Sequence, residues 1–104
     1  MAIQTTEVVN TDTTVYTSTD NSAITYAAFT NYTGATISVD IHVVPSGGSV
    51  GNVNCVVKGL EITAADTYQL YAGGEKLLLS NNDFISAISN VATGVNSVIS
   101  YTGI

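Results

Sequence analysis

Positive charge is almost missing from this chain of 104 residues, in which Lys58 and Lys76 are the only lysines and arginine is absent. Eight acidic residues bring the net charge to −6. A protein that binds nucleic acid needs several Lys or Arg side chains to displace counterions from the phosphates. An anionic membrane surface makes the same demand. The composition therefore argues against nucleic-acid and membrane partners.

Cysteine and proline each occur once, and tryptophan is absent. With Cys55 alone, the chain has no internal disulfide and no cysteine-based metal site. Its valine neighbours predict that Cys55 is a small buried apolar residue. No apolar run approaches the roughly 20 residues of a membrane-spanning helix. The N-terminus lacks the basic and apolar parts of a signal peptide, which predicts cytoplasmic synthesis without secretion.

Charged residues make up only 10% of the chain, against roughly 25% in ordinary soluble domains. The hydrophobic fraction of 45% nevertheless argues against disorder. The length fits one domain. We therefore expect a folded domain whose surface carries hydroxyls and amides rather than ions. Such a surface suits a protein that neighbours cover or that is displayed outside cells.

The clearest pattern in the chain is the alternation of polar and apolar residues from Thr36 to Val43. Ile37, Val39 and Ile41 point to one side of an extended strand, and Ser38, Asp40 and His42 point to the other. Clusters of Gly, Asn, Asp and Ser recur about every 8–12 residues, the spacing expected of a sandwich or barrel of short strands. The sequence predicts an all-β fold: a single antiparallel β-sandwich, jelly-roll or Ig-like, with 8–9 short strands.

The expected strands are short and separated by these turns. They cover residues 7–10, 14–18, 22–31, 35–44, 50–57, 67–72, 75–79, 83–89 and 97–102. The slip in alternation at Ala27-Ala28-Phe29 predicts a bulge, and Ile62–Asp66 is the one place for a short helical turn. Residues 1–13 are expected to be an N-terminal arm or edge strand, and residues 14–104 the β-sandwich domain. The expected core includes Val15, Ile24, Tyr26, Ile37, Val39, Ile41, Val43, Val56, Leu60, Leu70, Leu77, Leu79, Phe84, Ile85, Ile88, Val98 and Ile99.

Several short runs follow one another in a characteristic order. They are Thr14–Thr17, Ala23–Tyr26 and Asn31–Gly34, which lead into Thr36–Val43, and later Leu60–Leu70, Leu77–Leu79 and Asn82–Ile85. In this order, from Thr13 to Ile104, the chain resembles small β-sandwich virion proteins of tailed bacteriophages, which are found on heads, necks or tails. It departs from that pattern at Thr19-Asp20-Asn21, which replaces the usual Pro-Ala-Gly turn.

The resemblance implies a non-enzymatic structural protein of the virion that assembles in many copies, with a capsid decoration (cement) protein as the first choice. A neck or tail collar or adaptor component is the alternative within that class. A carbohydrate-binding module for host adsorption is the alternative from another class. The expected partners are other copies of this chain and other virion proteins, and no cofactor is expected.

Catalysis finds little support among the chemically active residues. His42 is the only histidine, and it needs an orienting carboxylate and a nucleophile on the same face. Asp40 lies on that face, but Cys55 qualifies only if it lies opposite His42. We expect His42 to be a surface or interface residue instead.

Metal binding and sugar binding are similarly weak predictions. The turn carboxylates lack the spacing of a Ca²⁺ loop, and Asp66 and Asp83 are expected to cap turn amides. Tyr68 and Tyr71, three residues apart, are expected on opposite faces of a strand. They would therefore not form one stacking platform for a sugar. The sequon at Asn31-Tyr32-Thr33 is interpreted as a chance match.

The N-terminal segment is the leading interface candidate. It is polar and only weakly alternating, and its apolar residues are Ile3, Val8 and Val9. Such an arm gains order by pairing with an open sheet edge of a neighbour. We therefore expect Ile3, Val8 and Val9 to contact another chain rather than this chain's own core. Tyr32 and His42 are the further interface candidates.

The face assignment of the alternating strand leads to a first prediction. Val39→Asp is expected to unfold the domain, because an unpaired charge in the core costs several kcal/mol out of a typical stability of about 5–15 kcal/mol. Ser38→Asp is expected to leave the thermal midpoint nearly unchanged. Equal thermal melts for the two variants would contradict the assignment.

Overall fold

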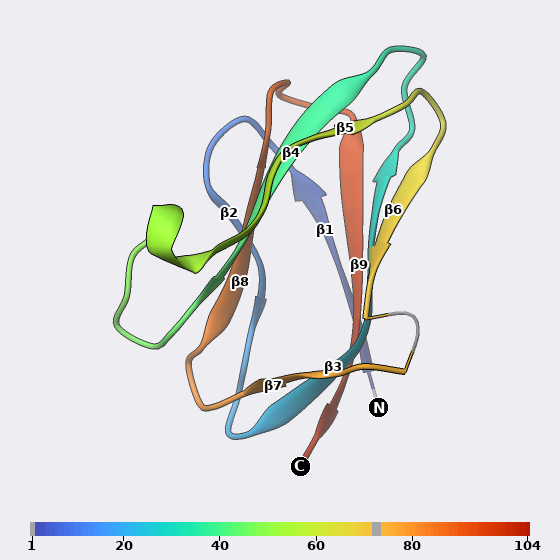
Figure 1. Ribbon diagram of the computed structural model, residues 1–104. Helices are drawn as coiled ribbons and strands as arrows, with labels where there is room; N and C mark the ends of the chain where they lie inside the picture. Colours follow the sequence, from blue (N-terminus) through green and yellow to red (C-terminus); the bar gives the residue numbers. More distant parts are fainter. Residues whose placement is uncertain (1, 72–73) are drawn as a thin grey trace.

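The computed structural model describes residues 2–71 and 74–104, and within them the chain is all-β (Figure 1). Met1, Ala72 and Gly73, which belong to the predicted arm, strand and turn, lie outside the described residues. The strands are β1 Ala2–Val8, β2 Thr13–Thr17, β3 Ser22–Asn31, β4 Ile37–Val44, β5 Cys55–Ile62, β6 Thr67–Leu70, β7 Leu77–Leu79, β8 Phe84–Ser89 and β9 Val95–Gly103. A three-residue 3₁₀ turn, η1, covers Asn52–Asn54.

The strands form two antiparallel sheets packed face to face. Sheet A has the order β1-β9-β3-β6, with β7 pairing beside β6 on the same side of β3, and sheet B has the order β2-β8-β4-β5. Each early strand therefore pairs with a late one: β1 with β9, β2 with β8, β3 with β6 and β7, and β4 with β5. The chain is one long hairpin rolled up so that β9 also pairs with β3 and β8 with β4. This is jelly-roll order, and it confirms the predicted β-sandwich.

The core lies between the sheets and is built from the inward positions of nearly every strand. Phe29 and Ile24 from β3, Ile41 from β4 and Ile99 from β9 are its largest fully buried side chains. Val39 is buried while Ser38 is only half-buried, so the faces of β4 are as predicted up to Ile41. Burial of each such side chain contributes about 1.5–3 kcal/mol. These aliphatic residues are the main source of the sandwich's stability.

The sequence misplaced strand β5 by about five residues. Residues 50–57 were expected to form the strand, but Asn52–Asn54 form the 3₁₀ turn and the strand covers Cys55–Ile62. The Lys58-Gly59 pair was interpreted as a turn. Gly59 instead has a φ of 61° inside a β-bulge, where β5 has one residue more than β4. Because of this shift, Val56, expected in the core, is 50% exposed.

The prediction that Val8 contacts another chain is wrong. The segment Ala2–Val8 is an edge strand that pairs with β9 along its whole length, from Ala2 opposite Tyr101 to Val8 opposite Val95. The inward position of Val8 places it in the chain's own core, with no exposed surface. The ladder with β9 supplies the order that its few apolar side chains cannot.

A fully buried amide, Asn31, joins the two sheets at one end of the sandwich. Its Nδ2 donates to the carbonyl oxygens of Ala35, 2.7 Å away, and Ile62, 2.8 Å away. Its Oδ1 accepts from the backbone N–H and the hydroxyl of Thr33. Asn31 thereby links β3 of sheet A to the end of β5 in sheet B. A glycan has no access to this side chain in the fold, so the sequon is a structural asparagine.

Replacement of this amide leads to a second prediction. Asn31→Ala removes a donor from the carbonyl oxygen of buried Ile62 and the acceptor of the Thr33 N–H, while the Ala35 carbonyl oxygen keeps the Thr33 hydroxyl as a partner. Each buried group left unpaired costs about 1–3 kcal/mol. We expect a loss of roughly 3 kcal/mol or more in urea unfolding, and less than about 0.5 kcal/mol for Asn96→Ala at a half-buried position. Matching midpoints for the two variants would show that Asn31 does not join the sheets.

Candidate functional site

The strand register brings His42 opposite Cys55 across β4 and β5, the arrangement that the catalytic alternative required. Ser86 of β8 lies on the other side of His42. His42 was expected at the surface or in an interface, but it is only 4% exposed. Its Nδ1 has no hydrogen-bond partner among the described residues. The expectation of a surface histidine is therefore wrong, and the geometry with Cys55 has to be judged on its contacts.

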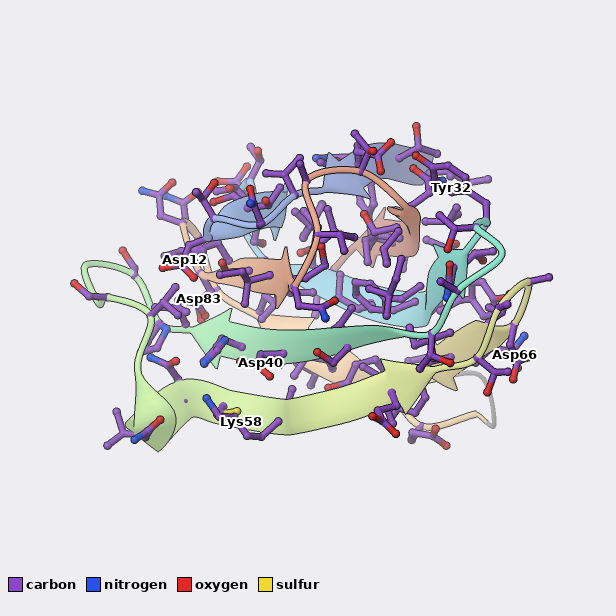
Figure 2. The ribbon with its side chains drawn as sticks, turned by 90° about the horizontal axis from the view of Figure 1, so that it is seen from above. Asp12, Tyr32, Asp40, Lys58, Asp66 and Asp83 are labelled. Carbon is purple, nitrogen blue, oxygen red and sulfur yellow. The ribbon has the colours of Figure 1, made fainter. Side chains whose placement is uncertain are left out.

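Those contacts do not form a catalytic chain. The nearby carboxylate of Asp40 accepts from the Gly59 N–H at 2.6 Å and from Lys58 Nζ at 3.3 Å (Figure 2). The Cys55 thiol donates to the carbonyl oxygen of Val57 at 3.3 Å. Nucleophilic catalysis needs a nucleophile bonded to a base and the base oriented by a third group. Here the carboxylate and the thiol are both engaged elsewhere.

Asp40 instead stabilises the bulge of β5. The hydrogen bond from Gly59, opposed by partial burial and aided by Lys58, holds the pKa of Asp40 below its usual value of 3.8. The ion pair with Lys58 is partly solvent-exposed, with 70% of the Lys58 side chain exposed, so the main-chain bond is the stronger contribution. Asp40, on the polar face of β4, thus helps to position β5.

The turn carboxylates also have structural partners. Asp83 accepts from the backbone N–H groups of Ser46 and Ser80, each at 2.8 Å, and Asp66 accepts from Thr67 at 2.8 Å. The predicted capping roles are confirmed. Figure 2 shows Asp66 on the opposite side of the molecule from Asp12 and Asp83. Over residues 2–71 and 74–104, no three His, Cys, Asp or Glu residues gather as metal ligands.

Among the edge strands of the two sheets, β1 is both long and regular. It has seven residues and pairs with β9 without a register shift. The edges formed by β2 and β5 contain bulges, and β6 and β7 have only four and three residues. Bulges, short strands and edge lysines protect a sheet edge from further pairing. The free side of β1 has none of these protections, which makes it the candidate interface.

Large apolar side chains are exposed on the edge strands and not on the central strands β3, β4, β8 and β9. They are Ile3 on β1, 69% exposed, Val56 on β5 and Leu78 on β7. Of the predicted interface residues, Ile3 is therefore accessible. Val9 is half-buried just after β1, and its carbonyl oxygen accepts from the Ser89 N–H.

Tyr32 is also accessible, with 55% of its surface exposed. Its hydroxyl donates to the Glu7 carboxylate at 2.9 Å, which raises the pKa of Tyr32. The same carboxylate accepts from the Gly94 N–H. The Tyr32 ring therefore stands beside β1, held by a contact to β1 itself.

The outer face of sheet A, which continues from β1, is largely uncharged. Rows of cross-strand neighbours run from Ile3 through Ser100 to Tyr26, from Thr5 through Val98 and Ala28 to Gln69, and from Glu7 through Asn96 and Thr30 to Thr67. Glu7, at one corner, is the charged member of these rows. The sequence did not identify this face. Residues 1–13 were expected to be an arm or an edge strand with the first strand at 7–10, whereas β1 covers Ala2–Val8. The outward positions of β1 depend on its pairing with β9.

Comparison with protein-family models, with curated proteins and with solved structures finds no match to this chain. Among the residues that the structure describes, no helix is long and apolar enough to cross a membrane.

The Asp40 contact leads to a third prediction, on stability against pH. Because folding lowers the pKa of Asp40, its ionised form contributes stability above the usual value of 3.8, and that contribution disappears as the pH falls through the folded pKa. Asp40→Asn is expected to flatten the decrease in thermal midpoint below about pH 4. At pH 7, Asp40→Ala should cost about 1.5–3 kcal/mol, the range for hydrogen bonds to charged groups.

The matched control is Glu61→Gln, which neutralises an exposed carboxylate on the neighbouring strand β5, two residues after Gly59. This variant should keep the wild-type dependence on pH. A profile for Asp40→Asn that coincides with that of Glu61→Gln would contradict the assigned role.

Proposed function

We propose that this protein is a non-enzymatic structural component of a tailed-bacteriophage particle, a capsid decoration (cement) protein that clamps neighbouring subunits. The observation that carries the proposal is the free edge of β1, which is long, regular and lined on its outer side by exposed Ile3. An added strand would gain main-chain hydrogen bonds along this edge. Ile3 would gain burial at the same time.

The composition of the surface supports the same function. Charges buried at a subunit contact are costly unless they are paired, whereas Ser, Thr and Asn side chains can be covered when they find hydrogen-bond partners. The outer face of sheet A offers such side chains at Thr5, Thr30, Thr67, Asn96 and Ser100. Many copies bound side by side multiply a modest contact energy. Jelly rolls occur among viral capsid domains and also among lectins. The proposal therefore rests on the β1 edge and the outer face of sheet A rather than on the fold.

The fourth prediction tests the β1 edge with a pair of matched variants. Ile3→Lys places a charge on that edge, and Leu78→Lys does the same on β7, where Leu78 is 65% exposed. Both changes are at the surface, so each should alter monomer stability by less than about 0.5 kcal/mol. Loss of Ile3 burial, about 2 kcal/mol, should weaken binding to particles roughly 30-fold, measured as occupancy after sedimentation. Leu78→Lys should bind as the unmodified chain does.

Unchanged occupancy with Ile3→Lys would refute the role of β1. If Leu78→Lys alone lost binding, the contact would lie on the β6–β7 edge instead. A neck or tail position would show the same dependence on Ile3, with the copies in a closed ring rather than on the head lattice.

A further inference from the structure

At one end of the sandwich the inward positions of the strands change from apolar to polar. Along β1 the inward residues run from Val8 through Thr6 to Gln4, because Val8 is in the core and alternate residues share its face. At the start of β3, the inward-facing residue next to Ile24 is Ser22. This is the end at which both termini lie (Figure 1).

A cavity of about 240 Å³ opens where these polar residues meet. Its floor is formed by buried Tyr16 and Ser22, and its rim by exposed Thr17, Thr19 and Gly103. Half-buried Gln4 and Tyr101 complete the lining, and none of its described residues has a charged side chain. Clefts for drug-sized ligands enclose about 300–1,000 Å³, so this cavity fits a group about the size of one ring.

The floor of the cavity is fixed before any ligand arrives. The Tyr16 hydroxyl donates to Ser22 Oγ at 3.0 Å, and Ser22 Oγ lies 2.6 Å from Ser18 Oγ. Ser18 Oγ in turn bonds the Asp20 carbonyl oxygen. The ring of Tyr101 packs against that of Tyr16 at a centroid distance of 4.5 Å and a tilt of 43°. An aromatic surface and a row of hydroxyls are thus held in position, which lowers the entropic cost of binding.

The rim offers polar groups that are free to bind a ligand. The side chains of Gln4, Thr17 and Thr19 form no hydrogen bond with another described residue. An amide both donates and accepts, and so does a hydroxyl. Together with a tyrosine face, such groups suit a neutral molecule with hydroxyls on its edge and C–H groups on its face. A lining without charge gives neither an anion nor a cation a counterion.

We propose that this cavity binds one neutral sugar ring, either a free monosaccharide or the terminal unit of a surface glycan. The ring would lie against Tyr101, with its hydroxyls bonded to Gln4 and to the threonines of the rim. The platform considered from sequence, Tyr68 and Tyr71, is not available. Both tyrosines pack against the core. Tyr71 lies just after the end of β6 and has a φ of 59°, so it does not follow the alternation of the strand. The sugar site does not depend on the β1 interface.

Gly103 provides a way to block the cavity without disturbing the fold. A Cβ atom built at Gly103 meets nothing within 4 Å, and its backbone is outside the left-handed region. A leucine there is expected to fill part of the cavity. Gly34, in the loop between β3 and β4, has the same free surroundings and an ordinary backbone, but it does not line the cavity. Gly34→Leu is therefore the matched control.

The experiment is titration of the ¹⁵N-labelled protein with glucose, galactose, mannose, rhamnose and N-acetylglucosamine, followed by amide chemical shifts. At least one sugar should give saturable shifts centred on the cavity residues. Gly103→Leu should raise the Kd about tenfold or more, while Gly34→Leu leaves it unchanged. Binding of the protein to immobilised neutral polysaccharides distinguishes the two sources of the sugar. A site for the terminal unit of a glycan should retain the protein on the polysaccharide, and a site for a free monosaccharide should not.

Three results would overturn the proposal. One is the absence of saturable shifts at the cavity with every sugar of the panel. Another is an equal Kd for Gly103→Leu and Gly34→Leu. The third is tighter binding of glucuronic acid than of glucose, which would contradict recognition by an uncharged lining.

Discussion

The ladder between β3 and β9 is the interaction on which the rest of the structure depends. It pairs Ser22–Asn31 with the last strand of the chain, Val95–Gly103. Among the described strands, β1 pairs with the rest of sheet A only through β9, and β6 and β7 only through β3. Sheet A is therefore complete only after β9, the last strand, has paired with β3 and β1. A topology of such distant pairings predicts slow, cooperative folding rather than the microsecond folding of helical bundles.

The same ladder determines the position of both regions for which a function is proposed. Because β9 lies between β1 and β3, the first strand becomes the outer edge of sheet A, with one side open. That open side is the basis of the assembly proposal. Near the C-terminal end of β9, Tyr101 and Gly103 line one cavity together with Gln4 from β1 and Ser22 from β3. An edge for strand pairing and a polar cavity thus follow from one topology, and they do not compete for the same side chains.

Local patterns predicted much of the fold. The bounds of β3 were predicted correctly, and the alternation of β4 placed Ile37, Val39 and Ile41 in the core. The bulge of β3, expected at Ala27–Phe29, lies between Ile24 and Tyr26. Its existence could be predicted because an extra residue breaks the alternation, but its position depends on the partner strand.

Features fixed by distant partners could not be predicted in this way. Gly59 looks like a turn residue until Asp40, 19 positions earlier, accepts its N–H. Val8 looked like part of an arm because its partner Val95 lies at the far end of the sequence. The burial of His42 and the meeting of Tyr16 with Tyr101 likewise depend on the rolled hairpin. Polar residues at inward positions, such as Gln4 and Ser22, are a usable signal for the cavity only after β1 and β3 are aligned.

The central claim is that β1 is the edge through which copies of this chain attach to a particle. Hydrogen–deuterium exchange of the isolated protein and of particle-bound protein tests it most directly. The β1 amides that face away from β9 should exchange freely in the isolated protein and at least about tenfold more slowly in the particle. The amides of β5 should exchange equally in both. Unchanged exchange along Ala2–Val8, or protection that appears on β5 instead, would contradict the account.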